Sequence, residues 1–105
     1  MKIDEALLKI INHYGINKQL KYIHSEYYEL DEAIIKFENC DFANWTASKN
    51  MFTKDIAEEI ADIIVMLKQF QYFYEITDKE IENIMKQKIN RQLERIDKEN
   101  DNNEQ

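Results

Sequence analysis

The sequence predicts an all-α protein, and three observations carry this prediction. The 105-residue chain contains no proline and one glycine, so it lacks the turn residues on which a many-stranded β fold depends. Apolar residues recur at spacings of three and four in four successive segments, as in amphipathic helices. The length suits one domain. We therefore expect a four-helix antiparallel bundle-like protomer.

The first two helices are predicted on either side of Gly15. The first covers about residues 4–14, and Gly15 occupies the position at which helices often end. Asn17 is the expected N-cap of the second helix. The apolar stripe of the second helix comprises Leu20, Ile23, Tyr27, Leu30, Ile34 and Phe37.

Residues 38–52 show no clean period and are expected to form an irregular connection in which Trp45 either caps a pocket or fills a gap. Thr53 is the expected N-cap of the third helix. The apolar stripe of this helix comprises Ile56, Ile60, Ile63, Leu67, Phe70 and Tyr74.

Thr77 and Glu80 have the spacing of a capping box, which predicts the start of the fourth helix. Its apolar residues are Ile81, Ile84, Met85, Ile89 and Ile96. We expect residues 1–96 to form a single all-α domain. The charged residues 97–105 have no apolar anchors and are expected to form a disordered acidic and polar C-terminal tail.

The charge, the apolar runs and the cysteine count of the chain indicate which partners and which cellular environment suit it. The net charge of −7 argues against nonspecific binding to nucleic acid or to an anionic membrane. No apolar run approaches the ~18 residues of a membrane span, and the N-terminus lacks the features of a signal peptide. A lone cysteine cannot form an internal disulfide, which suits a reducing cytoplasm. The aromatic run 70–74 is apolar on more than one side, so we expect a second subunit to cover part of the surface.

Two acidic pairs stand out from the other charged residues. Glu26 and Glu29 lie three residues apart beside the stripe of the second helix, and Glu59 and Asp62 lie likewise beside that of the third. If the two helices pack antiparallel, the pairs can face each other. Four close carboxylates repel one another, and a divalent cation with a preference for oxygen ligands, Mg²⁺ or Mn²⁺, would relieve the repulsion. The alternative is a solvated helix face.

The two segments that contain these acidic pairs resemble motifs of a known protein family. SEYYELDEAI (residues 25–34) and EEIADIIVML (residues 58–67) resemble the paired Glu-x-x-Glu and Glu-x-x-Asp motifs of the MazG-like all-α nucleoside triphosphate pyrophosphohydrolases. The resemblance covers about residues 17–95. It implies Mg²⁺-dependent cleavage of a (deoxy)nucleoside triphosphate to the monophosphate and pyrophosphate, as in nucleotide-pool house-cleaning, by a homodimer or homotetramer.

The resemblance also implies roles for individual residues. The metal ligands and catalytic residues would be Glu26, Glu29, Glu59 and Asp62. The residues that match the family's lysine, asparagine and arginine of the fourth helix, and would bind substrate phosphates, are Lys86, Asn90 and Arg91. One of the four carboxylates, or Glu58, would accept the proton of the attacking water.

Two further interpretations complete the sequence-based prediction. Tyr22 lies on the same flank as the carboxylates and is the candidate for stacking on the base. A shifted first motif built on Glu29 and Glu32 is disfavoured, because Glu32 points away from the apolar stripe. The alternative function is that of a non-catalytic helical interaction protein that forms oligomers and retains the fold.

Overall fold

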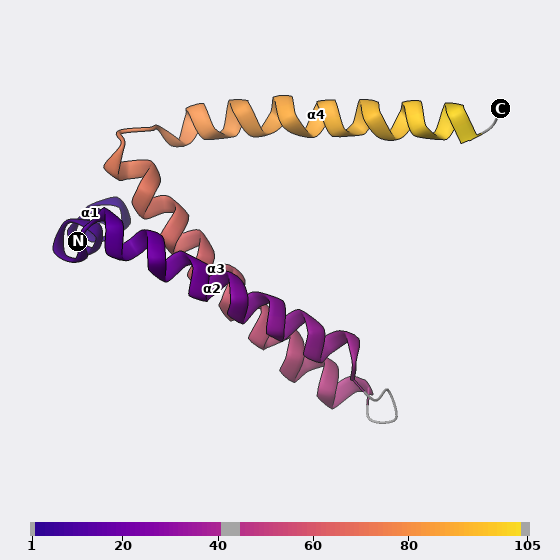
Figure 1. Ribbon diagram of the computed structural model, residues 1–105, viewed down its shortest axis with the longest axis horizontal. Coiled ribbons are helices and arrows are strands. Elements are labelled where there is room, and N and C mark those ends of the chain that lie inside the picture. Colours follow the sequence, from indigo (N-terminus) through magenta and orange to yellow (C-terminus); the bar gives the residue numbers. More distant parts are fainter. Residues whose placement is uncertain (1, 41–44, 104–105) are drawn as a thin grey trace. The chain divides into compact units, whose positions relative to one another are not determined.

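The structure is a computed structural model that describes residues 2–40 and 45–103, and the side chains of residues 2–40 and 49–102. These residues form four helices and no strand, namely α1 (Ile3–Tyr14), α2 (Ile16–Glu38), α3 (Trp45–Phe73) and α4 (Asp78–Asn103) (Figure 1). The predicted all-α class is confirmed. None of the described helices combines the length and the apolar character that a membrane span requires.

The chain divides into two compact units, Met1–Tyr74 and Glu75–Gln105. The first contains α1, α2 and α3, and the second contains α4. The arrangement of all four helices in one antiparallel bundle stays a prediction. Within the first unit, α2 and α3 lie side by side along most of their length, and α1 packs mainly against α3 (Figure 1). The buried apolar side chains of the described residues are Leu7, Ile11, Ala33, Ile63 and Met66.

Gly15 separates α1 from α2, as predicted. Its φ of +87° lies in the region that a residue without Cβ adopts at no steric cost. Its N–H donates to the carbonyl of Ile11 at 2.8 Å and closes α1. Helix α2 then begins at Ile16 with no side-chain capping bond. The predicted cap at Asn17 is therefore wrong, because the sharp turn at Gly15 starts α2 two residues earlier than a capped helix would begin.

Helix α3 begins at Trp45, so the predicted irregular stretch is wrong for residues 45–52. This segment contains neither glycine nor proline, and nothing in it stops a helix. Thr53 is not a cap, since its hydroxyl donates to the carbonyl of Lys49 at 2.8 Å inside the helix. Residues 41–44 and the side chain of Trp45, for which a role in the loop was expected, lie outside the described part.

The predicted start of α4 is confirmed, because Thr77 Oγ1 accepts a hydrogen bond of 3.1 Å from the N–H of Glu80. The helix continues through Asn103, beyond the expected end at Ile96. Residues 97–103 carry no helix-breaking glycine or proline, so the helix propagates through them. Residues 104–105 of the predicted tail lie outside the described part.

The face of α2 that is buried in the first unit coincides only in part with the predicted apolar stripe, of which Ile23, Leu30 and Phe37 are half-buried. The buried side chains of α2 are seven residues apart, at Gln19, Glu26 and Ala33. Their apolar neighbours one position later are exposed, by 47% at Leu20, 58% at Tyr27 and 40% at Ile34. These three residues of the stripe therefore lie outside the core of the first unit. The buried face of α2 therefore carries both polar and apolar side chains.

In α3, as in α2, the buried face is shifted around the helix from the predicted apolar stripe. Its buried residues are Ile63, Met66 and Gln69, of which only Ile63 belongs to the predicted stripe. Stripe residues Ile60, Leu67 and Tyr74 are exposed. The two helices thus bury polar residues together with Ala33, Ile63 and Met66, and part of their apolar surface is exposed. This shift brings the acidic flank of each helix into the interface between them.

Replacement of Ile11 by alanine tests the small core of the first unit. Ile11 is fully buried, so Ile11→Ala should lower the free energy of unfolding by about 2–5 kcal/mol. Ile3→Ala is the matched control, since Ile3 is 76% exposed and should cost less than about 1 kcal/mol. Urea unfolding followed by circular dichroism measures both variants. Equal losses would contradict the packing of α1 described above.

Candidate metal centre

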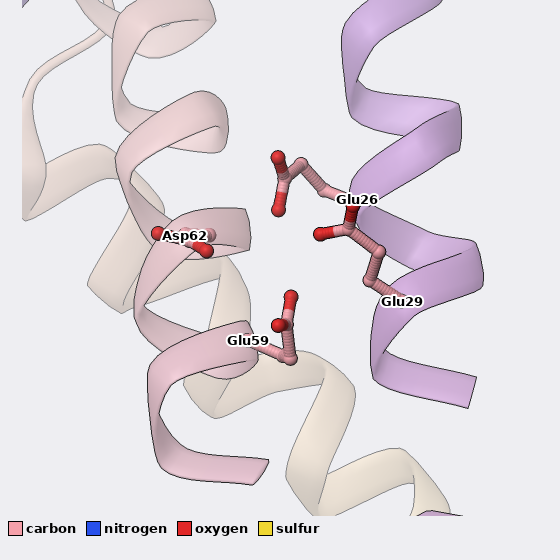
Figure 2. A group of neighbouring side chains, drawn as sticks. All are labelled: Glu26, Glu29, Glu59 and Asp62. Atoms are coloured by element: carbon pink, nitrogen blue, oxygen red, sulfur yellow. The ribbon is translucent and has the colours of Figure 1, made fainter. Parts of the chain in front are cut away.

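Four carboxylates meet between α2 and α3. Glu26 and Glu29 project from α2 toward Glu59 and Asp62 of α3 (Figure 2). Each residue offers one carboxylate oxygen, and these four oxygens lie within 4.8 Å of one another. Spacings of three residues place each pair on one side of its helix, and the packing of α2 on α3 turns the two pairs toward each other. The carboxylate cluster is thus a direct product of the two motifs.

The cluster combines buried and accessible ligands. Glu26 is only 4% exposed and Glu59 is half-buried, whereas Glu29 and Asp62 are exposed. Glu26 Oε2 and Glu59 Oε2 are buried and have no hydrogen-bond partner among the described residues. A buried carboxylate oxygen without a partner is costly. The groups that face these oxygens are other carboxylates, which accept hydrogen bonds and cannot donate them when ionised. A bound cation would remove the cost of burying the two oxygens.

The electrostatics of the cluster favour a bound cation or proton. Burial is the main cause that raises the pKa of Glu26, and the charges of Glu29 and Asp62 raise it further. Burial and the charge of Glu29 likewise raise the pKa of Glu59. A hydrogen bond to Glu26 raises the pKa of the Tyr22 hydroxyl, which therefore stays protonated and donates to that carboxylate. The site thus holds negative charge that it does not neutralise internally.

The ligand set fits a hard divalent cation. All four groups are carboxylates, which suit Mg²⁺ and Mn²⁺, and the set contains no histidine or cysteine. Glu26 is fixed by burial and Glu59 is half-buried, while the exposed pair leaves the cluster open toward solvent. Such an arrangement could hold an ion and still admit further oxygen ligands from water or a substrate.

Other predicted site residues lie outside the cluster. Glu58 and Glu32 are exposed and do not belong to it. Residues Lys86, Asn90 and Arg91 lie on α4, in the second unit, and are exposed. Lys86 pairs with Glu82 of the same helix at 3.3 Å. Their predicted contact with substrate phosphate stays a prediction.

Sequence reasoning missed a pocket that adjoins the cluster. It has a volume of about 430 Å³ and is lined by Glu26 and Asp62, by the predicted Tyr22, and by two buried amides, Gln19 and Gln69. The one signal for Gln19 is its spacing of seven residues from Glu26, which places both on the buried face of α2. The same spacing of seven residues relates Gln69 to Asp62 on α3.

Compared with known proteins, the chain matches no family model, no curated protein and no solved structure. The resemblance to the MazG-like proteins therefore stays a prediction.

The dependence of stability on pH tests the cluster directly. The pKa values of Glu26 and Glu59 are raised in the fold above their ordinary 4.5, so the folded form holds these protons more tightly than the unfolded form. For the metal-free protein, the two groups should therefore lower the free energy of unfolding as pH rises from about 4.5 through the raised pKa values. Thermal unfolding between about pH 5 and pH 8 measures this.

Mg²⁺ or Mn²⁺ at about 10 mM should raise the melting temperature at the upper end of this pH range by binding the folded form. Glu26→Gln removes a charge from the cluster and should flatten the pH dependence and reduce the effect of the cation. Glu32→Gln, an exposed site outside the cluster, is the control and should leave both unchanged. Identical behaviour of Glu26→Gln and the wild type would contradict this description of the cluster.

Proposed function

We propose that the protein is a Mg²⁺-dependent nucleoside triphosphate pyrophosphohydrolase that uses the carboxylate cluster between α2 and α3. One observation carries the proposal. Glu26 Oε2 and Glu59 Oε2 are buried, unpartnered and directed at two further carboxylates. A helical pair built only for packing gains nothing from such an arrangement. The two motifs that supply the cluster are those that resemble the MazG-like enzymes.

The metal ligands in this proposal are Glu26, Glu29, Glu59 and Asp62, with Mn²⁺ as a possible replacement for Mg²⁺. The bound cation would neutralise phosphate charge and favour cleavage of the bond between the α- and β-phosphates. The buried position of Glu26 and its hydrogen bond with Tyr22 fix the orientation of this carboxylate. A ligand whose rotamer is held in this way keeps the site ordered when substrate binds.

The exposed members of the cluster have a different role. Glu29 and Asp62 border solvent, so a triphosphate and a water molecule can reach the site from their side. One of the four carboxylates, or the exposed Glu58 beside Glu59, accepts the proton of the attacking water. The resemblance also implies a role in binding phosphate oxygens for Lys86, Asn90 and Arg91 of α4, whose cationic and amide groups suit such contacts.

The stripe residues left exposed in the first unit support a further part of the proposal, a homodimer or homotetramer. Leu20, Ile34, Ile60 and Leu67 are all at least 40% exposed. Few apolar side chains of the described residues are buried, which is a small core for a chain of this length. A second copy of the chain would bury these stripes and add the apolar contact that the first unit lacks.

Turnover is tested with a panel of ribo- and deoxyribonucleoside triphosphates, by measurement of pyrophosphate release with and without Mg²⁺. We expect metal-dependent release from at least one nucleotide. Glu59→Gln should reduce turnover at least about 100-fold with unchanged helix content, because it removes one ligand charge. Glu32→Gln is the matched control and should retain wild-type turnover. If Glu32→Gln abolishes turnover and Glu59→Gln does not, the ligand assignment is wrong.

Absence of turnover for every nucleotide, with no stabilisation by Mg²⁺, would refute the enzymatic proposal. The same protein would then fit the alternative of a helical interaction protein, for which the exposed stripes are the supporting observation.

Light scattering coupled to size-exclusion chromatography tests the assembly. At about 100 µM, the mass should be two or four times the 12.7 kDa of the chain. Leu67→Glu places a charge on the exposed stripe of α3 and should shift the protein toward the monomer. Lys9→Glu, on the exposed side of α1, is the control. A monomeric wild type would contradict the proposed assembly and leave the carboxylate cluster unaffected.

A further inference from the structure

The pocket beside the carboxylate cluster is built from all three helices of the first unit. Its lining includes Tyr14 of α1, Tyr22 of α2 and Met66 of α3. Its volume of about 430 Å³ falls in the range of roughly 300–1,000 Å³ that is typical of small-molecule sites. Glu26 and Asp62 belong both to this lining and to the cluster. The pocket and the cluster are therefore adjoining parts of one site.

The pocket contains a polar pair that packing alone does not require. Gln19 Nε2 donates to Gln69 Oε1 at 2.8 Å, and the two side chains are 6% and 2% exposed. Gln69 Nε2 also lies 3.7 Å from the sulfur of Met66, a weak acceptor. The bond between the amides uses one of the two N–H donors of Gln19 and leaves the lone pairs of its carbonyl oxygen. Gln19 thus retains both a donor and an acceptor.

The walls of the pocket suit a flat ring. Tyr14 and Tyr22 contribute aromatic rings, and Ile10 and Val65 contribute aliphatic side chains. Lys18 lies over the ring of Tyr14, with its Nζ 5.1 Å from the ring centroid, and places a cation at this side of the lining. Aromatic and aliphatic walls favour a planar heterocycle, whose edge then needs hydrogen-bond partners.

We propose that this pocket holds the base of a nucleoside triphosphate, and that Gln19 and Gln69 select which base binds. The proposal rests on the function proposed above. A triphosphate at the cluster leaves the organic part of the nucleotide next to Glu26 and Asp62, which the pocket shares. Each standard base carries donors and acceptors on its edge, and a carboxamide offers one of each side by side. Buried amides discriminate strongly, because a mismatched base leaves them unpaired.

Base preference is the measurement that tests this inference. The kcat/KM values of the wild type and of Gln19→Leu are compared for ATP, GTP, CTP, UTP and the four deoxynucleotides with Mg²⁺. In Gln19→Leu, the ratio between the best and the poorest base should fall by about 10-fold to 100-fold, the value of one or two hydrogen bonds. Inhibition by inorganic tripolyphosphate, which has no base, should be unchanged. Gln87→Leu, at an exposed position of α4, is the matched control.

A second variant keeps the test decisive if Gln19→Leu does not fold. Gln19→Glu has nearly the same shape but loses both N–H donors, and it should change which base is preferred. If a folded Gln19 variant retains the wild-type order and ratio of bases, the amide pair only ties α2 to α3 and the inference is overturned, while the hydrolase proposal stands. If the wild type hydrolyses no nucleotide, the hydrolase proposal fails and this inference fails with it.

Discussion

The carboxylate of Glu26 is the group on which the rest of the site depends. It is buried at the contact between α2 and α3, and one of its oxygens has no partner. Burial, and then the charges of Glu29 and Asp62, raise its pKa. An acid in this position is tolerated only if a proton or a cation accompanies it. The position also links two regions, because Glu26 belongs both to the carboxylate cluster and to the adjoining pocket.

The placement of this group follows from which faces of the helices meet. If the apolar stripes of α2 and α3 packed together, Leu20 and Leu67 would be buried and the acids would lie at the edge. Instead, the buried residues of the two helices include Gln19, Glu26 and Met66, and half of the residues of each stripe, Leu20 and Leu67 among them, are exposed. The polar interface builds the site, and the outward stripes retain the apolar area that a second copy can bury. The proposed active site and the proposed contact with a second copy would thus use different faces of the same two helices.

The sequence predicted the all-α class, the break at Gly15 and the helix cap at Thr77, because each depends on local chemistry. It also predicted the four residues of the cluster, since an i, i+3 spacing sets a common side. The start of α3 at Trp45 was missed because polar residues without glycine or proline can form either a loop or an exposed helix. The buried face of α2 and the amide pair were missed because tertiary packing decides them.

Titration calorimetry of the metal-free protein with Mn²⁺ tests the central claim most directly, if it is performed near the ordinary glutamate pKa of 4.5, at about pH 5, in two buffers with different ionisation enthalpies. Because the pKa values of Glu26 and Glu59 are raised, binding should release protons, and the measured heat should differ between the buffers. Glu26→Gln should weaken binding and reduce the number of protons released. An absence of binding, or equal affinity and proton release in the wild type and Glu26→Gln, would contradict a metal centre at this cluster.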